Sequence, residues 1–271
     1  MLKIAVIRVF CYNHRMKIII SPAKKMNEDQ RSIEPEGNPL YLKETREILK
    51  WIQGLSYDEC RELWAANEKI TDANFARFRD MDLERRLTPA ILSYEGIQYQ
   101  YMAPNCFETE DFGYVEEHLR ILSGFYGVLR PLDGVTPYRL EMQAKGAPGK
   151  ARDLYEFWGD KLYKGVIDDS RIIINLASKE YSKAVEKYLE PGDRFITCTF
   201  AEDMGVRDKQ GRPKLVTKGV YAKMARGEMV RYMAVNRVED PEDLKNFCAG
   251  TYVYREELSD EGNYVFTGRP E

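Results

Sequence analysis

The sequence predicts an α/β fold, with a mixed α+β arrangement as the alternative, in a single compact domain around a central sheet. Segments with helical and with strand patterns follow one another along the whole chain, which is typical of mixed folds. No repeat, low-complexity tract or polar linker divides the 271 residues. Hydrophobic residues make up 44% of the chain and charged residues 31%, a balance that suits one sizeable core under a polar surface.

Strands are predicted where short runs of β-branched or aromatic residues end at turn-forming residues. Such runs occupy residues 17–20, 171–176, 195–200 and 214–217. Among them, RIIINL at 171–176 has the clearest pattern of a buried strand. Residues 205–213 (GVRDKQGRP) are expected to form an exposed hairpin or loop, and the tail after Ser259 is expected to be polar and rich in turns.

Helices are predicted where apolar residues recur every three to four positions. These segments are residues 40–53, 56–66, 74–78, 112–122, 179–189 and 221–237. Ser56 and Glu59 form a capping box at the start of the second segment. In the last segment, alanine and methionine side chains share the packed side, and Lys223, Arg226 and Arg231 lie opposite them. That arrangement indicates either a basic stripe or an ordinary solvated helix face.

Composition and charge exclude several classes of function. A net charge of −3 and a pI of about 5.7 mean that any nucleic-acid surface has to be a local patch. The five cysteines include no CxxC pair, which favours reduced thiols in a cytosol over a disulfide framework. With His14 and His118 as the only histidines, neither a zinc site nor a His-based triad is indicated, and we predict no metal or cofactor. No apolar run is long enough to cross a bilayer, so no membrane association is expected.

Two predicted strands run directly into a serine. The strand at 17–20 ends at Ser21, and the strand at 171–176 leads to Ser178. Ligands of open α/β sheets tend to bind where strands end, and a helix N-terminus at that edge presents free N–H groups to an anion. If both strand ends lie at one edge, the side chains around a shared site would be Ser21, Lys24, Asn175 and Ser178. The alternative is ordinary helix capping by each serine.

Residues 122–142 (LSGFYGVLRPLDGVTPYRLEM) carry two arginines in apolar and glycine-rich surroundings. A buried arginine has to be paired or reach water, because its charge cannot be lost. Glu141 and Asp133 are the available partners of Arg130 and Arg139. The pattern therefore predicts either ion pairs that anchor a loop or one wall of a basic cleft, and the two can coexist. Likewise, Trp158 is either a stacking surface or part of the core.

The first fifteen residues precede a second methionine, Met16, which opens the segment MKIIISPAKKM. One interpretation is that residues 1–15 are an N-terminal extension that comes from an upstream start. The other is that residues 3–10 (KIAVIRVF) form an edge strand of the domain. N-terminal sequencing of the native product separates the two, because a mature chain that begins at Met1 excludes the upstream start.

Several unusual segments occur in one order along the chain. They are residues 20–26 (ISPAKKM), 119–142, 153–160 (DLYEFWGD), 174–181 (INLASKEY) and 223–237 (KMARGEMVRYMAVNR). Together they closely resemble the YaaA family of bacterial peroxide-stress proteins, from about Ile18 almost to the C-terminus. We therefore expect residues 16–271 to form a YaaA-like domain. No motif of a known enzyme class is among these segments, so the sequence leaves open whether the protein is an enzyme.

The resemblance implies a cytoplasmic protein with a basic cleft, which binds DNA and helps cells survive hydrogen peroxide by limiting free iron and oxidative damage. It also implies a helix-hairpin-helix element, and residues 65–78 match best, as two short helices around residues 69–72. The glycines whose amides would approach a phosphate are replaced by Thr71 and Asp72. This departure argues against DNA contact by the hairpin.

The leading hypothesis is a DNA-binding peroxide-stress protein of low sequence specificity. Its basic wall would be formed by Lys24, Arg130, Arg139, Lys223, Arg226 and Arg231, with Tyr138 or Trp158 as stacking surfaces. The alternative is an enzyme that acts on a nucleotide or nucleic acid in the same cleft, with a reactive edge of Ser21, Lys24, Glu141 and Ser178. Direct iron binding is the least favoured hypothesis, because the carboxylates are dispersed and no histidine is near them. The sequence names no catalytic residue and no oligomeric state.

Overall fold

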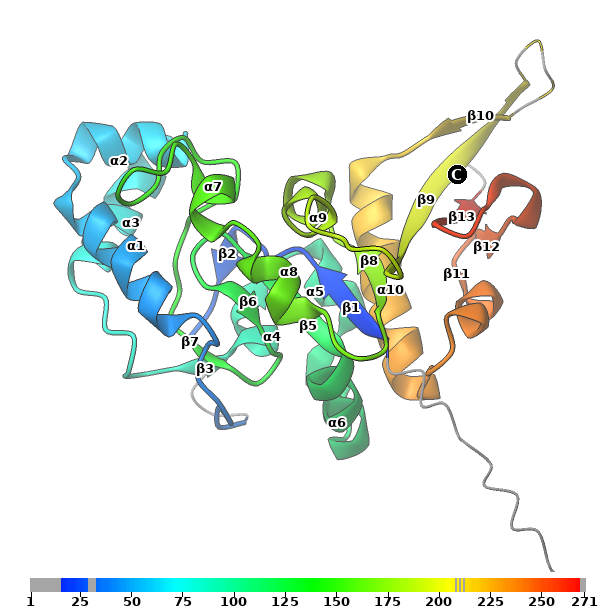
Figure 1. Cartoon of the computed structure of the whole chain (residues 1–271), viewed down its shortest axis with the longest axis horizontal. Coiled ribbons are helices and arrows are strands. Elements are labelled where there is room, and N and C mark those ends of the chain that lie inside the picture. Colours follow the sequence, from blue (N-terminus) through cyan, green and yellow to red (C-terminus); the bar gives the residue numbers. More distant parts are fainter. Residues whose placement is uncertain (1–15, 29–32, 208, 210, 212, 269–271) are drawn as a thin grey trace, which may run out of the picture.

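The computed structural model describes residues 16–28, 33–207, 209, 211 and 213–268. These residues form one mixed α/β domain around a nine-stranded sheet, as the sequence predicts (Figure 1). The strands of this sheet are β1 (Lys17–Ile20), β5 (Leu119–Ser123), β6 (Gly127–Leu129), β8 (Ile172–Leu176), β9 (Arg194–Arg207), β10 (Pro213–Val216), β11 (Cys248–Ala249), β12 (Tyr252–Tyr254) and β13 (Asn263–Gly268). Residues 1–15, where the sequence left two interpretations, lie outside the described residues.

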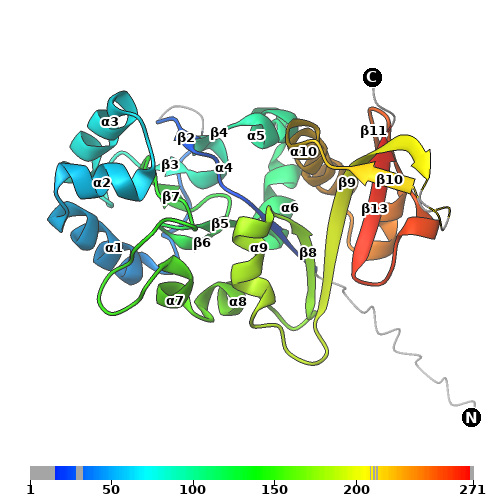
Figure 2. The same cartoon turned by 90° about the horizontal axis from the view of Figure 1, so that it is seen from above.

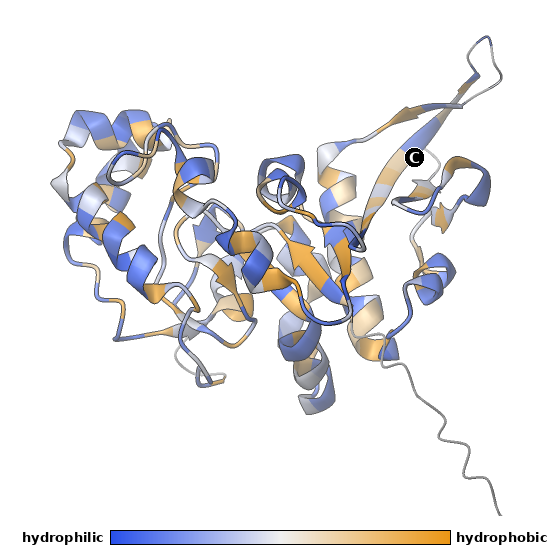
Figure 3. Ribbon diagram, viewed as in Figure 1, coloured by the Kyte–Doolittle hydropathy of each residue, from blue (hydrophilic) through white to orange (hydrophobic). Residues whose placement is uncertain are grey.

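The sheet has a parallel centre with antiparallel strands on both sides. Its order is β11-β12-β13-β9-β8-β1-β5-β6, and β10 pairs with β9. The five strands from β13 to β5 are mutually parallel. Ile18, Ile19 and Ile20 of β1 are fully buried between β8 and β5, which explains the unbroken apolar run. Figure 3 shows the same apolar character in the central strands.

Helices cover both faces of this parallel centre. The described residues form the helices α1 (Leu42–Gly54), α2 (Tyr57–Trp64), α3 (Glu68–Arg79), α4 (Ala90–Ser93), α5 (Ile97–Met102), α6 (Thr109–His118), α7 (Leu154–Trp158), α8 (Lys161–Val166), α9 (Lys179–Glu186) and α10 (Gly219–Asn236). Figure 2 shows α8 and α9 on one side of β1 and β8, and α5, α6 and α10 on the other. The capping box of Ser56 and Glu59 is present at the start of α2, as predicted. Within the described part of the chain, no helix combines the length and apolar content that a membrane span requires.

Short elements complete the fold. Two small sheets pair β2 (Lys25–Met26) with β4 (Tyr94–Glu95) and β3 (Thr88–Pro89) with β7 (Gly134–Val135). Three 3₁₀ turns span Pro104–Cys106, Pro241–Asn246 and Glu256–Leu258. The β2–β4 pair follows β1 directly and so holds the chain close to the end of the parallel centre.

The helix predicted at 112–122 is wrong in its second half. The helix α6 ends at His118, and the next five residues form β5 beside β1. Leu119 and Leu122 fit the helical period, yet both are fully buried in the strand. The same apolar residues satisfy either pattern, and pairing with β1 selects the strand.

The tail after Ser259 is also not the polar, turn-rich segment that the sequence suggests. It contains β13, which pairs in parallel with β9 along six residues. Tyr264, Val265 and Phe266 are buried there. A short apolar run next to glycine and asparagine has only a weak strand pattern. The pairing with β9 therefore decides that this segment is a strand of the central sheet.

The two short helices predicted around residues 69–72 do not exist. The helix α3 runs without a break from Glu68 to Arg79, and the Asn67 side chain caps its start. The turn lies earlier, at residues 65–67, where Ala65 adopts a left-handed conformation with φ of 43°. The element is therefore α2, a three-residue turn and α3.

One close helix contact shapes the region that follows. A Cβ atom added at Gly227 of α10 would lie 2.1 Å from the backbone oxygen of Gln98 in α5. Only glycine lets the two helices approach so closely. This contact brings the side chains of α5 next to those of α10.

Candidate functional site

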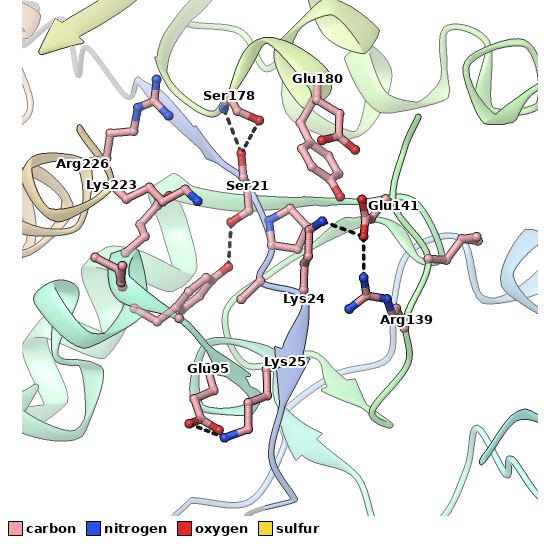
Figure 4. A pocket seen from close by; sticks show the side chains of 18 of the residues that line it. Ser21, Lys24, Lys25, Glu95, Arg139, Glu141, Ser178, Glu180, Lys223 and Arg226 are labelled. Atoms are coloured by element: carbon pink, nitrogen blue, oxygen red, sulfur yellow. Dashed lines mark hydrogen bonds and ion pairs between the residues drawn. The ribbon is translucent and has the colours of Figure 1, made fainter. Parts of the chain in front are cut away.

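A cavity of about 390 Å³ lies where β1 and β8 end. Ile20 is opposite Leu176 in the parallel pair, so both strands end at one edge of the sheet, as predicted. We call this cavity the edge cavity; the lining residues that matter here are Ser21, Lys24, Gln98, Glu141, Glu180 and Arg226. Figure 4 shows the charged side chains around it.

Two serines join the strand ends. The Ser21 hydroxyl accepts a hydrogen bond from the Ser178 backbone N–H at 2.8 Å, and the two hydroxyl oxygens are 3.2 Å apart. Ser178 begins α9 as its N-cap residue, but its side chain makes no capping hydrogen bond. The capping alternative therefore does not describe Ser178, whose hydroxyl contacts Ser21 in the edge cavity.

One side of the edge cavity holds a carboxylate between two cations. The Lys24 ammonium lies 2.9 Å from Glu141 Oε1, and the Arg139 guanidinium donates to the same oxygen at 3.1 Å. Lys24 extends from the chain between β1 and β2, whereas Arg139 and Glu141 come from the loop after β7. Since the Lys24 side chain is largely exposed, the pair orients Glu141 more than it stabilises the fold.

Glu180 lies on the same side, in the first turn of α9. Burial raises the pKa of its carboxyl group, the nearby Glu141 raises that pKa further, and Lys24 lowers it. Its carboxylate accepts a hydrogen bond from the Gln143 backbone N–H at 3.3 Å. We call Glu141 and Glu180 the carboxylate end of the edge cavity.

The opposite side carries hydrogen-bond donors that lack acceptors. Arg226 Nε and Gln98 Nε2 are buried without a hydrogen-bond partner, and Gln98 is only 7% exposed. Burial lowers the pKa of Arg226, and the nearby Cys198 thiol offsets part of that effect. Lys223 projects into the cavity one turn earlier on α10 (Figure 4). We call Gln98, Lys223 and Arg226 the donor end.

The two aromatic residues expected as stacking surfaces are buried. Tyr138 is 4% exposed, and its hydroxyl contacts those of Tyr94 at 2.8 Å and Ser123 at 2.6 Å. Trp158 is 1% exposed and donates its indole N–H to the Gly124 carbonyl at 3.0 Å. Trp158 therefore packs in the core, which agrees with the core alternative and not with a stacking role. Tyr138 lines the edge cavity with little exposed surface, and its stacking role stays a prediction.

Other predicted residues lie outside the edge cavity. Arg130 is about half exposed, and its Nε lies 3.8 Å from both Glu116 and Asp133, which matches the ion-pair alternative. Arg231 is exposed farther along α10, where its charge acts on Asp111. Neither arginine lines the edge cavity.

Asn175 is likewise absent from the edge cavity, because its side chain binds within the sheet. It donates to Thr197 Oγ1 at 3.2 Å and accepts a hydrogen bond from the Ala177 backbone N–H at 2.9 Å. These bonds join β8 to β9 and fix the turn that leads into α9. Asn175 and Arg226 both line a neighbouring cavity of about 490 Å³.

Sequence reasoning missed Gln98 and Glu180. Glu180 stands within INLASKEY, two residues after Ser178, so its position after a strand end was a usable signal. The sequence around Gln98 carries no such signal, because only the contact between α5 and α10 brings this residue close to the segment of Arg226. Among the residues that the structure describes, no three His, Cys, Asp or Glu side chains gather as metal ligands would.

The fold and this site define a mixed α/β protein with a charged cavity at the carboxyl edge of its parallel strands. The chain belongs to the peroxide stress protein YaaA family, whose model matches residues 16–258. This confirms the resemblance seen in the sequence. A UPF0246 protein of Agathobacter rectalis is 58% identical over 251 residues, which cover 93% of this chain and 98% of the relative. UPF0246 proteins of Lachnoclostridium phytofermentans and Pediococcus pentosaceus are 49% and 48% identical, over 93% of this chain and 96% and 97% of the relatives.

Proposed function

We propose that this peroxide-stress protein binds DNA with low sequence specificity, and that phosphate groups contact Lys223 and Arg226. The observation that carries the proposal is the donor end of the edge cavity. Among the described residues, Lys223 and Arg226 have no acidic partner. A half-buried arginine without a counter-ion is costly unless a ligand supplies one, and a phosphate is the anion that suits its planar donors.

The size of the cavity limits how DNA could bind. A volume of about 390 Å³ is that of a small-molecule site, so a duplex would contact only the rim. Lys24 and Lys223 have exposed side chains at that rim. Phosphate contacts position a protein on DNA but carry no sequence information, which is why we propose low specificity.

The proposal extends to the role that the family resemblance implies in the cell. In the cytoplasm, the protein would lower the concentration of free iron during peroxide stress and so limit oxidative damage. The test compares chelatable iron in peroxide-treated cells that carry wild type, Arg226→Ala or no protein. Iron that stays equal in all three strains would remove this part of the proposal.

A salt series tests DNA binding. Each phosphate contact adds about 0.9 to the slope of log affinity against log salt, so Lys223→Ala and Arg226→Ala should each flatten it by about that amount. Arg130→Ala is the matched control, because it removes an equal charge outside the edge cavity. The measurement is fluorescence anisotropy of a labelled duplex. Equal slopes in all four proteins would refute phosphate contact at the donor end, and absent binding by wild type would refute DNA binding.

An enzyme that acts on a nucleotide or nucleic acid is the second candidate. The contact between Lys24 and Glu141 at 2.9 Å favours it, together with the Ser21 and Ser178 hydroxyls in the same cavity. Carboxylate, ammonium and hydroxyl groups around one cavity are the groups that acid–base and nucleophilic catalysis use. Mass spectrometry of nucleotides and DNA incubated with wild type or Glu141→Gln tests it. No product in the wild-type sample would exclude this candidate for the substrates used.

A further inference from the structure

The edge cavity has two ends of different charge: the donor end carries cations without acidic partners in the part of the chain that the structure describes, and the carboxylate end holds Glu180 beside the cluster of Lys24, Arg139 and Glu141. At the donor end, Gln98 Nε2 and Arg226 Nε are buried without an acceptor among the described residues, and Lys223 is exposed beside them. At the carboxylate end, Glu180 has no ion pair with any described residue. Figure 4 shows Lys223 and Arg226 on one side of Ser21, and Glu141 and Glu180 on the other. A ligand that spans the cavity therefore needs acceptors at one end and donors at the other.

Part of the lining of the edge cavity is uncharged. Ile97, Tyr99, Leu140 and Tyr181 line it, and the Tyr99 hydroxyl is already used by the Ser21 carbonyl at 3.0 Å. Burial raises the pKa of both tyrosines, which stay neutral at physiological pH. An uncharged, largely apolar part of a ligand fits there.

These three zones restrict the ligand. An α-amino acid carries its ammonium and carboxylate groups on one carbon, so it cannot place them at opposite ends of the cavity. A nucleotide supplies a phosphate for the donor end, a flat ring for the uncharged lining and, on adenine, guanine or cytosine, an amino group for Glu180. Uracil and thymine present a carbonyl oxygen in place of the amino group of cytosine, and a carboxylate repels it.

We infer that the edge cavity binds one nucleotide whose base carries an amino group, with its phosphate at Lys223 and Arg226 and the amino group at Glu180. This inference rests on the proposed function, because both require phosphate at the donor end. It goes further in assigning base selection to Glu180. The nucleotide is either free or an unpaired nucleotide of a DNA strand, since both present the same phosphate and base.

Isothermal titration calorimetry with AMP, CMP and UMP, and with the corresponding nucleosides, tests the inference. AMP and CMP should bind at least about tenfold more tightly than UMP, because UMP loses a hydrogen bond to a charged group. Nucleosides should bind more weakly than nucleotides to wild type, and this difference should shrink in Arg226→Ala, where Lys223 alone contacts the phosphate. Glu180→Gln should abolish the preference over UMP, since an amide can turn either a donor or an acceptor to the base.

Glu190→Gln is the matched control for Glu180→Gln. Glu190 follows the same helix, pairs with Arg171 and does not line the edge cavity, so its replacement should leave the preference intact. Short single strands of adenine or thymine distinguish the source of the nucleotide. Preference among mononucleotides alone indicates a free nucleotide, and preference among the strands indicates an unpaired nucleotide of DNA; both outcomes support the inference.

Three results would overturn the inference. They are equal binding of AMP, CMP and UMP, tighter binding of free amino acids than of any nucleotide, and no nucleotide binding by a protein that binds duplex DNA with the expected salt slope. In each case the salt series still decides the DNA proposal separately. Selective nucleotide binding without duplex binding would support the inference and refute the DNA proposal.

Discussion

Replacing Gly227 by alanine should destabilise the protein, although alanine is the better helix former. The exchange within α10 gains about 1 kcal/mol of helix propensity. The new methyl group, however, would lie 2.1 Å from the Gln98 carbonyl oxygen and 2.8 Å from the Met102 nitrogen. Both atoms belong to backbone, so α5 and α10 have to move apart. Overpacking of this kind costs about 1–3 kcal/mol, and such short contacts place the cost at or above the upper end.

The expected net effect is a loss of about 2 kcal/mol, equivalent to a Tm lower by about 4–8 °C in a domain of this size. Gly113→Ala is the matched control. Gly113 lies inside α6, and a Cβ atom there meets nothing within 4 Å. This change should raise the Tm by about 2–4 °C, because only the propensity gain remains. Thermal melts followed by circular dichroism measure both variants, and a Tm for Gly227→Ala at or above that of wild type would refute the close contact.

Two further predictions concern a buried acid and the thiols. Burial raises the pKa of Asp133 to about 6, so the folded state holds this proton more tightly than the unfolded chain. The resulting stabilisation is complete below about pH 4 and is lost as pH rises through 6, by at most about 3 kcal/mol. The free energy of unfolding of Asp133→Asn, measured with denaturant across this pH range, should not show that loss. If wild type and the variant lose stability in parallel as pH rises, the prediction is wrong. Burial also raises the pKa of Cys198 to about 12, whereas Cys106 and Cys248 are exposed. A Cys106→Ser, Cys248→Ser variant should still protect peroxide-stressed cells, because no thiol switch is predicted; loss of protection in a folded variant would disprove this.

Local sequence patterns were sufficient to predict those elements whose conformation does not depend on the segments they pair with. Apart from Lys17 and Asn175, the runs that became β1 and β8 are apolar, because strands covered on both faces have no solvent side. The capping box of α2 is a contact between residues three positions apart, so it is visible in the sequence. In β5 and β13 the local pattern was ambiguous or weak, and pairing with β1 and β9 decided the outcome.

Part of the candidate site could be predicted for the same reason. Ser21 and Ser178 each follow a strongly patterned strand, and parallel strands end at a common edge, so their proximity follows from the topology. Glu141 was a predicted partner of Arg139, two residues away, and the contact exists at 3.1 Å. The pair formed by Lys24 and Glu141 joins segments more than a hundred residues apart, and no local rule specifies it.

The sequence by itself determined the α/β class, the buried central strands, the family and the strand ends at which a site would form. Those properties depend on apolar runs, caps and characteristic segments, which are written locally along the chain. The tertiary structure alone decided which charges share a cavity. Arg226 and Gln98 line one cavity because Gly227 lets α10 approach α5, while Arg130 pairs with Asp133 elsewhere. An arginine carries the same charge in either place, so its role depends on which groups the packing brings within reach.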